Sequence, residues 1–404
     1  MPSARTDKKA PPRSRLQSPV VLASAAGAIV VALIVAAVMS KPRPAPAPTE
    51  HPSPSSAVAA AEPPACQKLD AAVSALTPRQ KLAQLLMVGV KNLADAQAVV
   101  REQEVGGIFI TSWTDYSMLG APLAALAQEP RPLPLAVSVD EEGGRVQRLK
   151  SLIGSQPSPR ALVAAGKTPE QVREIARLRG QAMKELGITI DFAPVVDITD
   201  AADGTVIGDR SWGDTAEAVT AYAGAYAAGL RDAGLLPVLK HFPGHGHASG
   251  DSHKGGVVTP PLDQLEQLDL VPYQSLTTQQ PVAVMVGHMQ VPGLTDTDPA
   301  SLSKAAYDLL RSGAYGGQPF NGAVFTDDLS SMGAITQRYS VPEAVLRALQ
   351  AGADTALWIT TKEVPDVLDR LQQAVDAHEL AAERVDDAVR RMAVTKDPSL
   401  ACTR

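Results

Sequence analysis

Eight short apolar runs, separated by segments with helical periodicity, constrain the fold of this 404-residue chain more than any other feature. The runs are Leu85–Val90, Gly107–Thr111, Leu135–Asp140, Asp191–Ile198, Leu236–His241, Val282–Met289, Ala323–Leu329 and Thr355–Thr360. Several are almost continuously apolar, as strands buried on both faces of a parallel sheet are. Strand and helix therefore alternate, which predicts an α/β fold with a parallel sheet.

Two of the segments between the runs begin with a clear helix-start signal. Thr77–Gln80 and Thr168–Gln171 each place a Thr at the N-cap, a Pro in the first turn and a Gln three residues after the Thr. This is the pattern of a capping box, in which two side chains satisfy free backbone N–H groups. We therefore expect helices to begin at these two positions.

Polar side chains gather at the carboxyl ends of four of the apolar runs. They are Asp140, Lys240, His241, His288, Asp327 and Asp328. A (β/α)8 barrel places its active site at the carboxyl ends of its strands. An open doubly wound sheet, which the periodicity alone also allows, would concentrate such residues near one switch point. We therefore expect one TIM-type (β/α)8 barrel.

The first 65 residues differ in composition from the rest of the chain. They hold twelve of the 33 prolines, in two groups that flank an uncharged stretch at residues 20–39. Twenty helical residues at about 1.5 Å each cover the ~30 Å apolar core of a bilayer. Lys and Arg residues precede this stretch, and the positive-inside rule then places the N-terminus in the cytoplasm.

We predict four segments from this pattern. Residues 1–19 form a cytoplasmic basic segment, 20–39 a transmembrane anchor, 40–65 a Pro/Ala-rich linker and 66–404 the folded domain. The protein would then be a single-pass cell-membrane protein with its folded domain outside the cytoplasm. The alternative is that 20–39 is a signal sequence, whose cleavage would release a secreted protein.

The charge and the two cysteines narrow the class of the folded domain. The whole chain has a net charge of -6, and residues 66–404 alone carry -10, so a generally basic nucleic-acid binder is excluded and no nucleic-acid partner is expected. Cys66 and Cys402 lie at the two ends of the domain. Domain termini are often close together and an extracytoplasmic setting is oxidising, so we predict a disulfide between them.

The segment from Lys240 to His253 concentrates candidate catalytic groups. It contains four of the seven histidines and is too rich in Gly and Pro to form a helix. Asp251 can accept a ring N–H from His253, which leaves the other ring nitrogen free to exchange protons. A metal-dependent hydrolase is the alternative, although the helical pattern of two His four residues apart is missing.

Two further stretches carry candidate groups. In Phe325–Leu329, Asp327 and Asp328 follow a predicted strand, and only one of two adjacent strand residues can face the barrel mouth. That residue is a candidate nucleophile or metal ligand, and an Asp capping the next helix is the alternative. The other stretch is Ser138–Arg148, in which Asp140 ends an apolar run and can accept hydrogen bonds from sugar hydroxyls. Arg148 is either a substrate clamp or a solvated charge.

Several spaced motifs, taken in order, resemble glycoside hydrolase family 3, and specifically its β-N-acetylhexosaminidase branch. The motifs are Val139–Val146, Phe192–Asp197, Asp209–Ser211, Lys240–Gly246, Asp251–His253, Gly287–His288 and Phe325–Leu329. The resemblance covers about residues 70–395 and implies a single (β/α)8 barrel. The sequence differs from the common pattern at Thr326, Ser331 and His247, and none of these changes removes a catalytic group.

The resemblance also implies roles for individual residues. Asp327 matches the nucleophile, and His253, supported by Asp251, matches the acid/base on a mobile loop. The residues matching those that hold the N-acetylglucosamine ring are Asp140, Arg148, Arg210, Lys240 and His241. No metal and no cofactor is implied.

The sequence thus predicts a retaining β-N-acetylglucosaminidase that acts on N-acetylglucosamine-containing cell-wall glycan or muropeptide. A family 3 β-glucosidase and an N-acetylglucosamine phosphorylase are the alternatives among enzymes with the same catalytic groups. A membrane-tethered sugar-binding protein without activity is the alternative that is not an enzyme.

Overall fold

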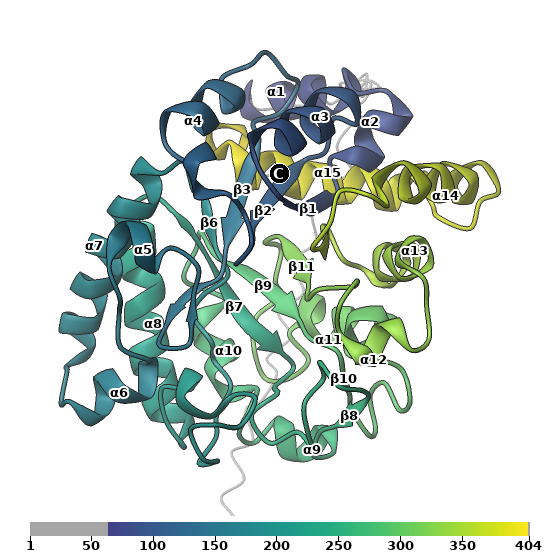
Figure 1. Ribbon diagram of the computed structural model, residues 1–404. Helices are drawn as coiled ribbons and strands as arrows, with labels where there is room; N and C mark the ends of the chain where they lie inside the picture. The colour runs from purple at the N-terminus through teal and green to yellow at the C-terminus, as the bar shows by residue number, and fades with distance from the viewer. Residues whose placement is uncertain (1–63, 403–404) are drawn as a thin grey trace, which may run out of the picture. The chain divides into compact units, whose positions relative to one another are not determined.

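Eight parallel strands form the centre of the computed structural model, which describes residues 64–402 (Figure 1). In sheet order they are β11 (Val324–Thr326), β9 (Ala283–Val286), β7 (Leu236–Phe242), β6 (Ile190–Asp191), β3 (Ala136–Val139), β2 (Gly107–Ile110), β1 (Leu86–Val90) and β12 (Ala356–Trp358). A parallel bridge between Phe325 and Thr355 joins the two edges of this sheet. Thr326 adds a contact there, because its Oγ1 accepts the Leu357 N–H at 3.0 Å. The predicted α/β fold is confirmed, as a nearly closed parallel barrel.

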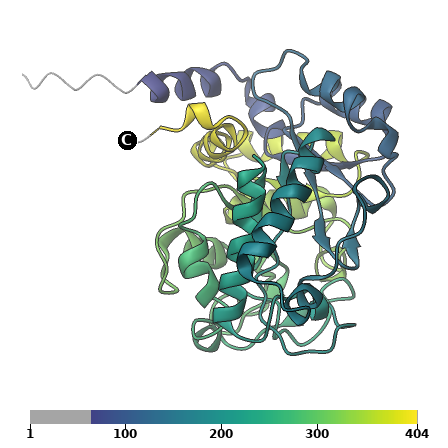
Figure 2. The same ribbon diagram turned by 90° about the vertical axis from the view of Figure 1, so that its left-hand side faces the viewer.

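Helices cover the outside of the barrel (Figure 1). They are α1 (Pro64–Ser74), α2 (Pro78–Ala83), α3 (Leu93–Glu102), α4 (Ala121–Ala127), α5 (Lys150–Ile153), α6 (Pro159–Ala164), α7 (Pro169–Glu185), α8 (Ala216–Asp232), α9 (Leu262–Leu265), α10 (Val271–Leu276), α11 (Lys304–Ser312), α12 (Gly333–Thr336), α13 (Val341–Ala351), α14 (Val364–Asp376) and α15 (Ala382–Lys396). Both predicted capping boxes are present, at the starts of α2 and α7. The long helices α7 and α8 lie side by side in Figures 1 and 2.

Two small sheets and several 3-10 turns lie outside the eight-stranded barrel sheet. The small sheets pair β4 (Glu141–Gly143) with β5 (Val146–Gln147) and β8 (Val257–Val258) with β10 (Met289–Gln290). The 3-10 turns are Tyr116–Met118, Gly208–Arg210, Ala300–Leu302 and Pro398–Leu400. The β4–β5 hairpin matters most for function, because it follows β3 directly and leads to Arg148.

Two apolar layers hold the barrel together. One lies between the strands and the surrounding helices. The other lies within the barrel, where Phe192 contacts Phe109 and Phe325 with ring centroids 5.6 and 5.5 Å apart. Because neighbouring strand residues point to opposite faces, each strand contributes to both layers. The barrel interior is therefore packed, and a site can open only at its ends.

Two predicted strands are shorter than expected. The run Asp191–Ile198 is a strand only at Ile190–Asp191, since Pro194 has no N–H to donate to a sheet ladder. Strand β11 ends at Thr326, so Asp327 and Asp328 lie just beyond it. The expectation that strand alternation selects one of these two carboxylates is therefore wrong, and their hydrogen bonds separate them instead.

The predicted segments 1–19 and 20–39, and the linker up to residue 63, lie outside the described residues. Helix α1 begins at Pro64, two residues before the predicted start of the folded domain. Across residues 64–402, no helix is both long and apolar enough to cross a bilayer.

The predicted disulfide between Cys66 and Cys402 is confirmed. The two Cα atoms lie 4.8 Å apart, although 336 positions separate them in the chain. Helix α1 packs against α15, which brings the two ends of the described chain together (Figure 2). Closing so long a loop restricts the unfolded chain, an effect typically of about 2–4 kcal/mol.

Candidate active site

A cavity of about 240 Å³ opens at the carboxyl ends of the strands. Five of the candidate residues named from the sequence line it: Asp140, Arg148, His253, Asp327 and Asp328. Its floor consists of barrel-interior side chains such as Phe109 and Met285, which are buried. Residues from several strands and the loops that follow them thus converge on one polar opening over an apolar floor.

Asp327 presents a carboxylate to this cavity. Its Oδ1 accepts the N–H of Asp328 at 2.8 Å. Burial tends to raise the pKa of Asp327, but His288, His241, the Asp328 N–H and Lys240 outweigh it and hold the pKa well below the usual range. The carboxylate is therefore ionised at neutral pH, as a nucleophile requires.

Asp328 has a different role. Its Oδ1 accepts the backbone N–H of Ser330 at 2.8 Å and the Ser330 hydroxyl at 2.9 Å, and its Oδ2 accepts the Ser331 hydroxyl. These bonds make Asp328 the cap of the turn that leads to α12. Of the two adjacent carboxylates, Asp327 is the one left available to a ligand.

A network of buried charges lies beside the cavity. Lys240 Nζ contacts Asp140 Oδ1 at 2.7 Å and Glu142 Oε1 at 2.6 Å. Arg210 makes a two-pronged contact with Glu142, with both N···O distances at 2.8 Å. Arg148 reaches Asp140 Oδ2 at 3.4 Å. Asp140 and Arg148 line the cavity, whereas Lys240 and Arg210 lie behind them.

The electrostatics of this network favour the charged forms of Glu142, Lys240 and Arg210. Burial would raise the pKa of Glu142, but Arg210 and Lys240 hold it far below its ordinary value. Burial would lower the pKa of Lys240 and of Arg210, and the carboxylates of Asp140 and Glu142 raise both instead. Alternating opposite charges thus compensate one another, which a buried charge requires.

Glu141 supports the hairpin that leads to Arg148. Its carboxylate is fully buried and pairs with Arg179 of α7. Its Oε2 also accepts the N–H groups of Arg148 and Leu149, both at 2.8 Å. These hydrogen bonds fix the backbone at Arg148, and the Arg148 side chain lines the cavity.

His241 lies deeper and is held by Asp197. The distance from His241 Nδ1 to Asp197 Oδ2 is 2.7 Å, and Asp197 Oδ1 accepts the backbone N–H groups of His241 and His245. Burial would raise the pKa of Asp197, but the neighbouring His241 outweighs burial, so the pKa lies below its ordinary value. Asp197 therefore fixes both the ring of His241 and the backbone after β7.

Asp251 and His253 form the predicted pair. Asp251 Oδ1 lies 2.8 Å from His253 Nδ1 and accepts the His253 backbone N–H at 3.0 Å. The His253 side chain is 58% exposed. Burial would raise the pKa of Asp251, but the hydrogen bonds from His253 outweigh burial, so the pKa lies below its ordinary value. An ionised Asp251 thus orients the imidazole and leaves Nε2 for the cavity.

The residue between them anchors the loop. Ser252 is 1% exposed, and its Oγ lies 3.0 Å from His245 Nε2. The carbonyls of Ser252 and His253 accept the N–H groups of Ala334 and Gly333 at the start of α12. The loop therefore attaches to the barrel through its backbone and Ser252, while the side chains of Asp251 and His253 extend outward.

The five histidines between residues 241 and 288 each have a different side-chain partner. Besides the pairs above, His247 Nδ1 contacts Asp269 at 3.0 Å and His288 Nδ1 lies 2.6 Å from Ser301 Oγ. Within residues 64–402, no group of three or more potential ligands is arranged to hold a metal ion.

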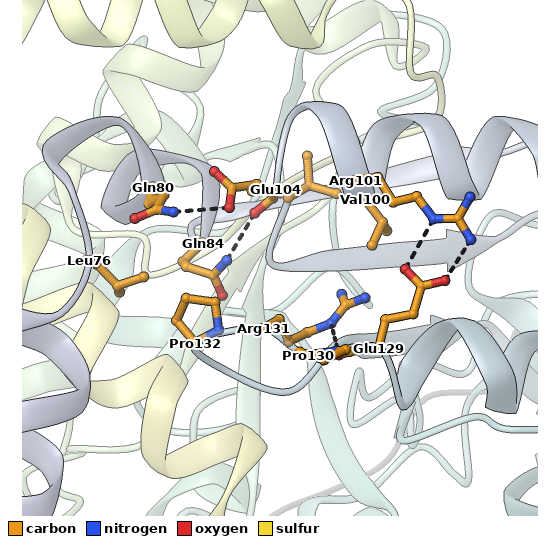
Figure 3. A pocket seen from close by; sticks show the side chains of 11 residues that line it. Leu76, Gln80, Gln84, Val100, Arg101, Glu104, Glu129, Pro130, Arg131 and Pro132 are labelled. Atoms are coloured by element: carbon orange, nitrogen blue, oxygen red, sulfur yellow. Dashed lines mark hydrogen bonds and ion pairs between the residues drawn. The ribbon is translucent and has the colours of Figure 1, made fainter.

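A second pocket of about 190 Å³ lies among residues that precede β1, β2 and β3, at the opposite ends of the strands (Figure 3). Polar residues that line this pocket interact with one another. Arg101 forms an ion pair with Glu129, and the Gln80 side chain donates a hydrogen bond to Glu104 at 2.9 Å. None of the residues proposed for catalysis lines it. The first cavity is therefore the candidate active site.

Glu142 and Asp197 are among the residues of this site that were not singled out from the sequence. They lie inside the motifs Val139–Val146 and Phe192–Asp197, so the motifs contain them without showing their partners. Each is paired with groups from other strands, and only the folded chain shows these pairings.

An ionised carboxylate and an Asp-oriented imidazole in one polar cavity at a barrel mouth are the groups that a glycoside hydrolase needs. The chain belongs to glycosyl hydrolase family 3, since the family's N terminal domain matches residues 77–395. The resemblance predicted from the sequence motifs is therefore confirmed.

Relatives and solved structures agree with this family. The chain is 63% identical over 349 residues to the β-hexosaminidase LpqI of Mycobacterium tuberculosis, covering 86% of this chain and 90% of the relative. A crystal structure of a family 3 glycosyl hydrolase from Mycobacterium smegmatis is 68% identical, with a TM-score of 0.80 over 81% of this chain and 99% of that one. A β-N-acetylglucosaminidase structure from a Paenibacillus species is 35% identical, with a TM-score of 0.75 over 81% of this chain and 64% of that one.

Proposed function

We propose that this family 3 hydrolase is a retaining β-N-acetylhexosaminidase that removes terminal β-linked N-acetylglucosamine. The observation that carries the proposal is that Asp327 and the Asp251-oriented His253 line the same cavity. The 63% identity to a β-hexosaminidase supports the choice of sugar.

In the first step, an Asp327 oxygen attacks the anomeric carbon while the bond to the leaving oxygen breaks. His253 Nε2 gives its proton to that oxygen, so the leaving sugar departs as a neutral alcohol. In the second step, the now neutral His253 takes a proton from water, and the water oxygen displaces Asp327 from the anomeric carbon. Two displacements at one carbon retain the β configuration.

The charged network would hold the ring during these steps. Asp140 and Arg148 line the cavity and are placed to bind ring hydroxyls directly. Lys240, His241 and Arg210 are buried beside them and would contact the sugar or keep Asp140 and Glu142 in place. The carboxylate of Asp140 can accept hydrogen bonds from the hydroxyl groups, and hydrogen bonds to a charged group are stronger than neutral ones.

We further propose that the enzyme acts outside the cytoplasm on N-acetylglucosaminyl-β-1,4-N-acetylmuramyl fragments of the cell wall. The uncharged stretch at 20–39 supports a membrane anchor, and the Pro/Ala-rich segment after it supports a spacer between membrane and barrel. Cleavage within the N-terminal segment would give a secreted enzyme with the same activity. The Cys66–Cys402 disulfide is consistent with either location, because both are oxidising.

One set of assays tests the activity. The purified protein is given 4-nitrophenyl N-acetyl-β-glucosaminide and 4-nitrophenyl β-glucoside, each with and without inorganic phosphate, and early products are followed by proton NMR. We expect hydrolysis of the N-acetylated substrate alone, with the β anomer formed first and no sugar phosphate. Preference for the glucoside would indicate a β-glucosidase, and sugar phosphate a phosphorylase. Binding of N-acetylglucosamine without turnover would indicate a sugar-binding protein.

A further inference from the structure

Trp113 is an aromatic side chain that the proposed reaction does not use. It is 52% exposed, whereas Trp212 and Trp358 are almost completely buried. It follows β2 and lines the same cavity as Asp327 and His253. An exposed indole that lines a cavity beside the proposed catalytic groups is available to contact a ligand.

The loop that carries Trp113 is held firmly in place. Thr111 and Thr114 on either side of it are buried, and their hydroxyls lie 3.0 Å apart. Thr114 Oγ1 also donates to the carbonyl of Val90 on β1 at 2.7 Å, and the Trp113 N–H donates to Thr111 Oγ1 at 3.4 Å. The indole is therefore presented from a fixed backbone, so little ordering entropy is lost when a ligand binds to it.

The cavity has a floor and a rim, and Trp113 belongs to the rim. The floor residues Phe109, Met285 and Leu357 are at most 5% exposed. Trp113 and His253 are both exposed. A terminal sugar attacked by Asp327 would lie toward the buried floor. The group beyond the cleaved bond would then lie nearer the exposed residues of the cavity, which include Trp113 and His253.

We propose that Trp113 forms the binding site for the leaving sugar, with its indole face stacked against the pyranose ring next to the cleaved bond. This proposal rests on the glycosidase function proposed for the site and adds the specificity for the group attached to the terminal sugar. An indole is a rigid apolar plate with a polar N–H at its edge, which suits the C–H face and hydroxyl edge of a sugar ring. The ligand class is a β-linked disaccharide, or a longer glycan, with a pyranose in the leaving position.

The test compares a substrate that has a leaving ring with one that has none. N,N′-diacetylchitobiose places a pyranose at the rim, whereas N-acetyl-β-glucosaminyl fluoride releases only fluoride. For Trp113→Ala we expect kcat/KM on the disaccharide to fall roughly fivefold to tenfold. The value on the fluoride should stay within about twofold, which also shows that the variant is folded.

Two matched variants sharpen the comparison. Trp113→Phe keeps an aromatic face and should recover most of the loss on the disaccharide. Leu178→Ala removes an apolar side chain of similar exposure, 54%, that does not line the cavity, and should leave both substrates unaffected.

Equal losses on both substrates, or no loss on either, would overturn the role of Trp113 and leave the proposed activity intact. A wild-type protein that cleaves neither substrate would overturn the proposed activity, and the leaving-sugar site with it. The two failures are therefore distinguishable.

Discussion

Two parts of the active site are built in opposite ways. The centre of the network around Lys240 is buried: the side chains of Lys240 and Glu142 are 3% and 1% exposed, and each of these two charges meets an opposite one within 3 Å. The pair Asp251–His253 lies on a loop, with its side chains 30% and 58% exposed. The first part depends on contacts between distant strands, and the second on one local hydrogen-bonded pair.

The difference reflects the task of each part in the proposed reaction. A group that holds the sugar benefits from a low dielectric and from fixed partners, which strengthen its contacts with a ligand. A group that delivers a proton and then takes one from water must reach solvent and a changing partner. Buried strand ends suit the first task and an exposed loop the second. Substitutions in the two parts should therefore differ in their effects on stability and on catalysis.

The largest expected effect is on catalysis through Asp327. Asp327→Ala removes the attacking oxygen, and kcat on an aryl N-acetyl-β-glucosaminide should fall by ~10⁴-fold or more. The melting temperature should fall slightly, because the variant loses the interactions that hold the pKa of Asp327 below its usual range. Added azide should restore turnover of the aryl substrate by attacking from the vacated side, with an α-glycosyl azide as product. Retention of full hydrolysis by this variant would contradict the assignment of the nucleophile.

The next effect is on stability through Lys240. Lys240→Met leaves Asp140 and Glu142 close together without the cation between them, and loss of one partner from a buried ion pair costs about 3–5 kcal/mol. We expect the lower end of this range, because Arg210 still pairs with Glu142. Urea unfolding measures the change in the free energy of unfolding.

A surface ion pair provides the control for Lys240. Lys304 contacts Asp308 at 2.6 Å, but its side chain is 72% exposed. Lys304→Met should therefore change stability by less than about 1 kcal/mol. If the two variants lose the same amount, burial does not distinguish the network from an ordinary surface pair.

His253→Ala should have the reverse profile. Loss of a general acid typically costs 10²–10⁴-fold, and we expect kcat/KM on N,N′-diacetylchitobiose to fall by ~10²–10³-fold. The loss should be much smaller on a dinitrophenyl glycoside, whose leaving oxygen needs no proton. Stability should stay within about 0.5 kcal/mol, because the side chain is exposed. His378→Ala, at an exposed histidine outside the cavity, is the matched control, and equal losses on the two glycosides would argue against proton donation by His253.

Several residues of the buried network, and the exposed pair Asp251–His253, could be predicted from the sequence. Asp140, Lys240 and Asp327 lie at or near the carboxyl ends of apolar runs, and a barrel brings these ends to one face. The local pair Asp251–His253 was also predictable, since the two residues are separated by only one position. Short-range patterns carry this kind of information directly.

The partners within the buried network could not be predicted in the same way. Glu141 and Glu142 are adjacent and chemically alike, yet one pairs with Arg179 and the other with Arg210 and Lys240. Which carboxylate faces which cation depends on the turn at β4 and on contacts with residues far away in the chain. The exposure of Trp113 likewise depends on neighbouring loops. Spacing along the chain holds no record of these tertiary contacts.

We expect the stability of the folded protein to depend on pH through His245. This ring is buried beneath the loop, and burial lowers its pKa from 6.5 to about 4. The unfolded chain therefore takes up a proton near pH 6.5, while the folded protein does so only near pH 4. The contribution of His245 to stability is complete above pH 6.5 and is lost as the pH falls toward 4, by ~1.4 kcal/mol per pH unit at most.

The measurement is the free energy of unfolding at several values between about pH 7 and pH 4, for the wild type and for His245→Gln. The variant lacks this titrating group, so its stability should fall less steeply over the same interval. Parallel curves for the two proteins would show that His245 does not titrate differently on unfolding.

The smallest expected effect is that of Ser252→Ala, which tests how the exposed pair depends on its buried anchor. The variant loses the hydrogen bond to His245 Nε2, an interaction of about 1 kcal/mol, and leaves that buried nitrogen without its partner. Because the backbone bonds to Gly333 and Ala334 remain, the loop should stay attached but hold His253 less precisely. We expect kcat/KM on N,N′-diacetylchitobiose to fall a few-fold, while the dinitrophenyl glycoside, which needs no proton, is cleaved almost normally. Ser155→Ala, at an exposed serine, should change neither rate. Equal losses on both substrates would mean that Ser252 supports the barrel mouth as a whole, and that the loop and the buried network are less independent than their exposures indicate.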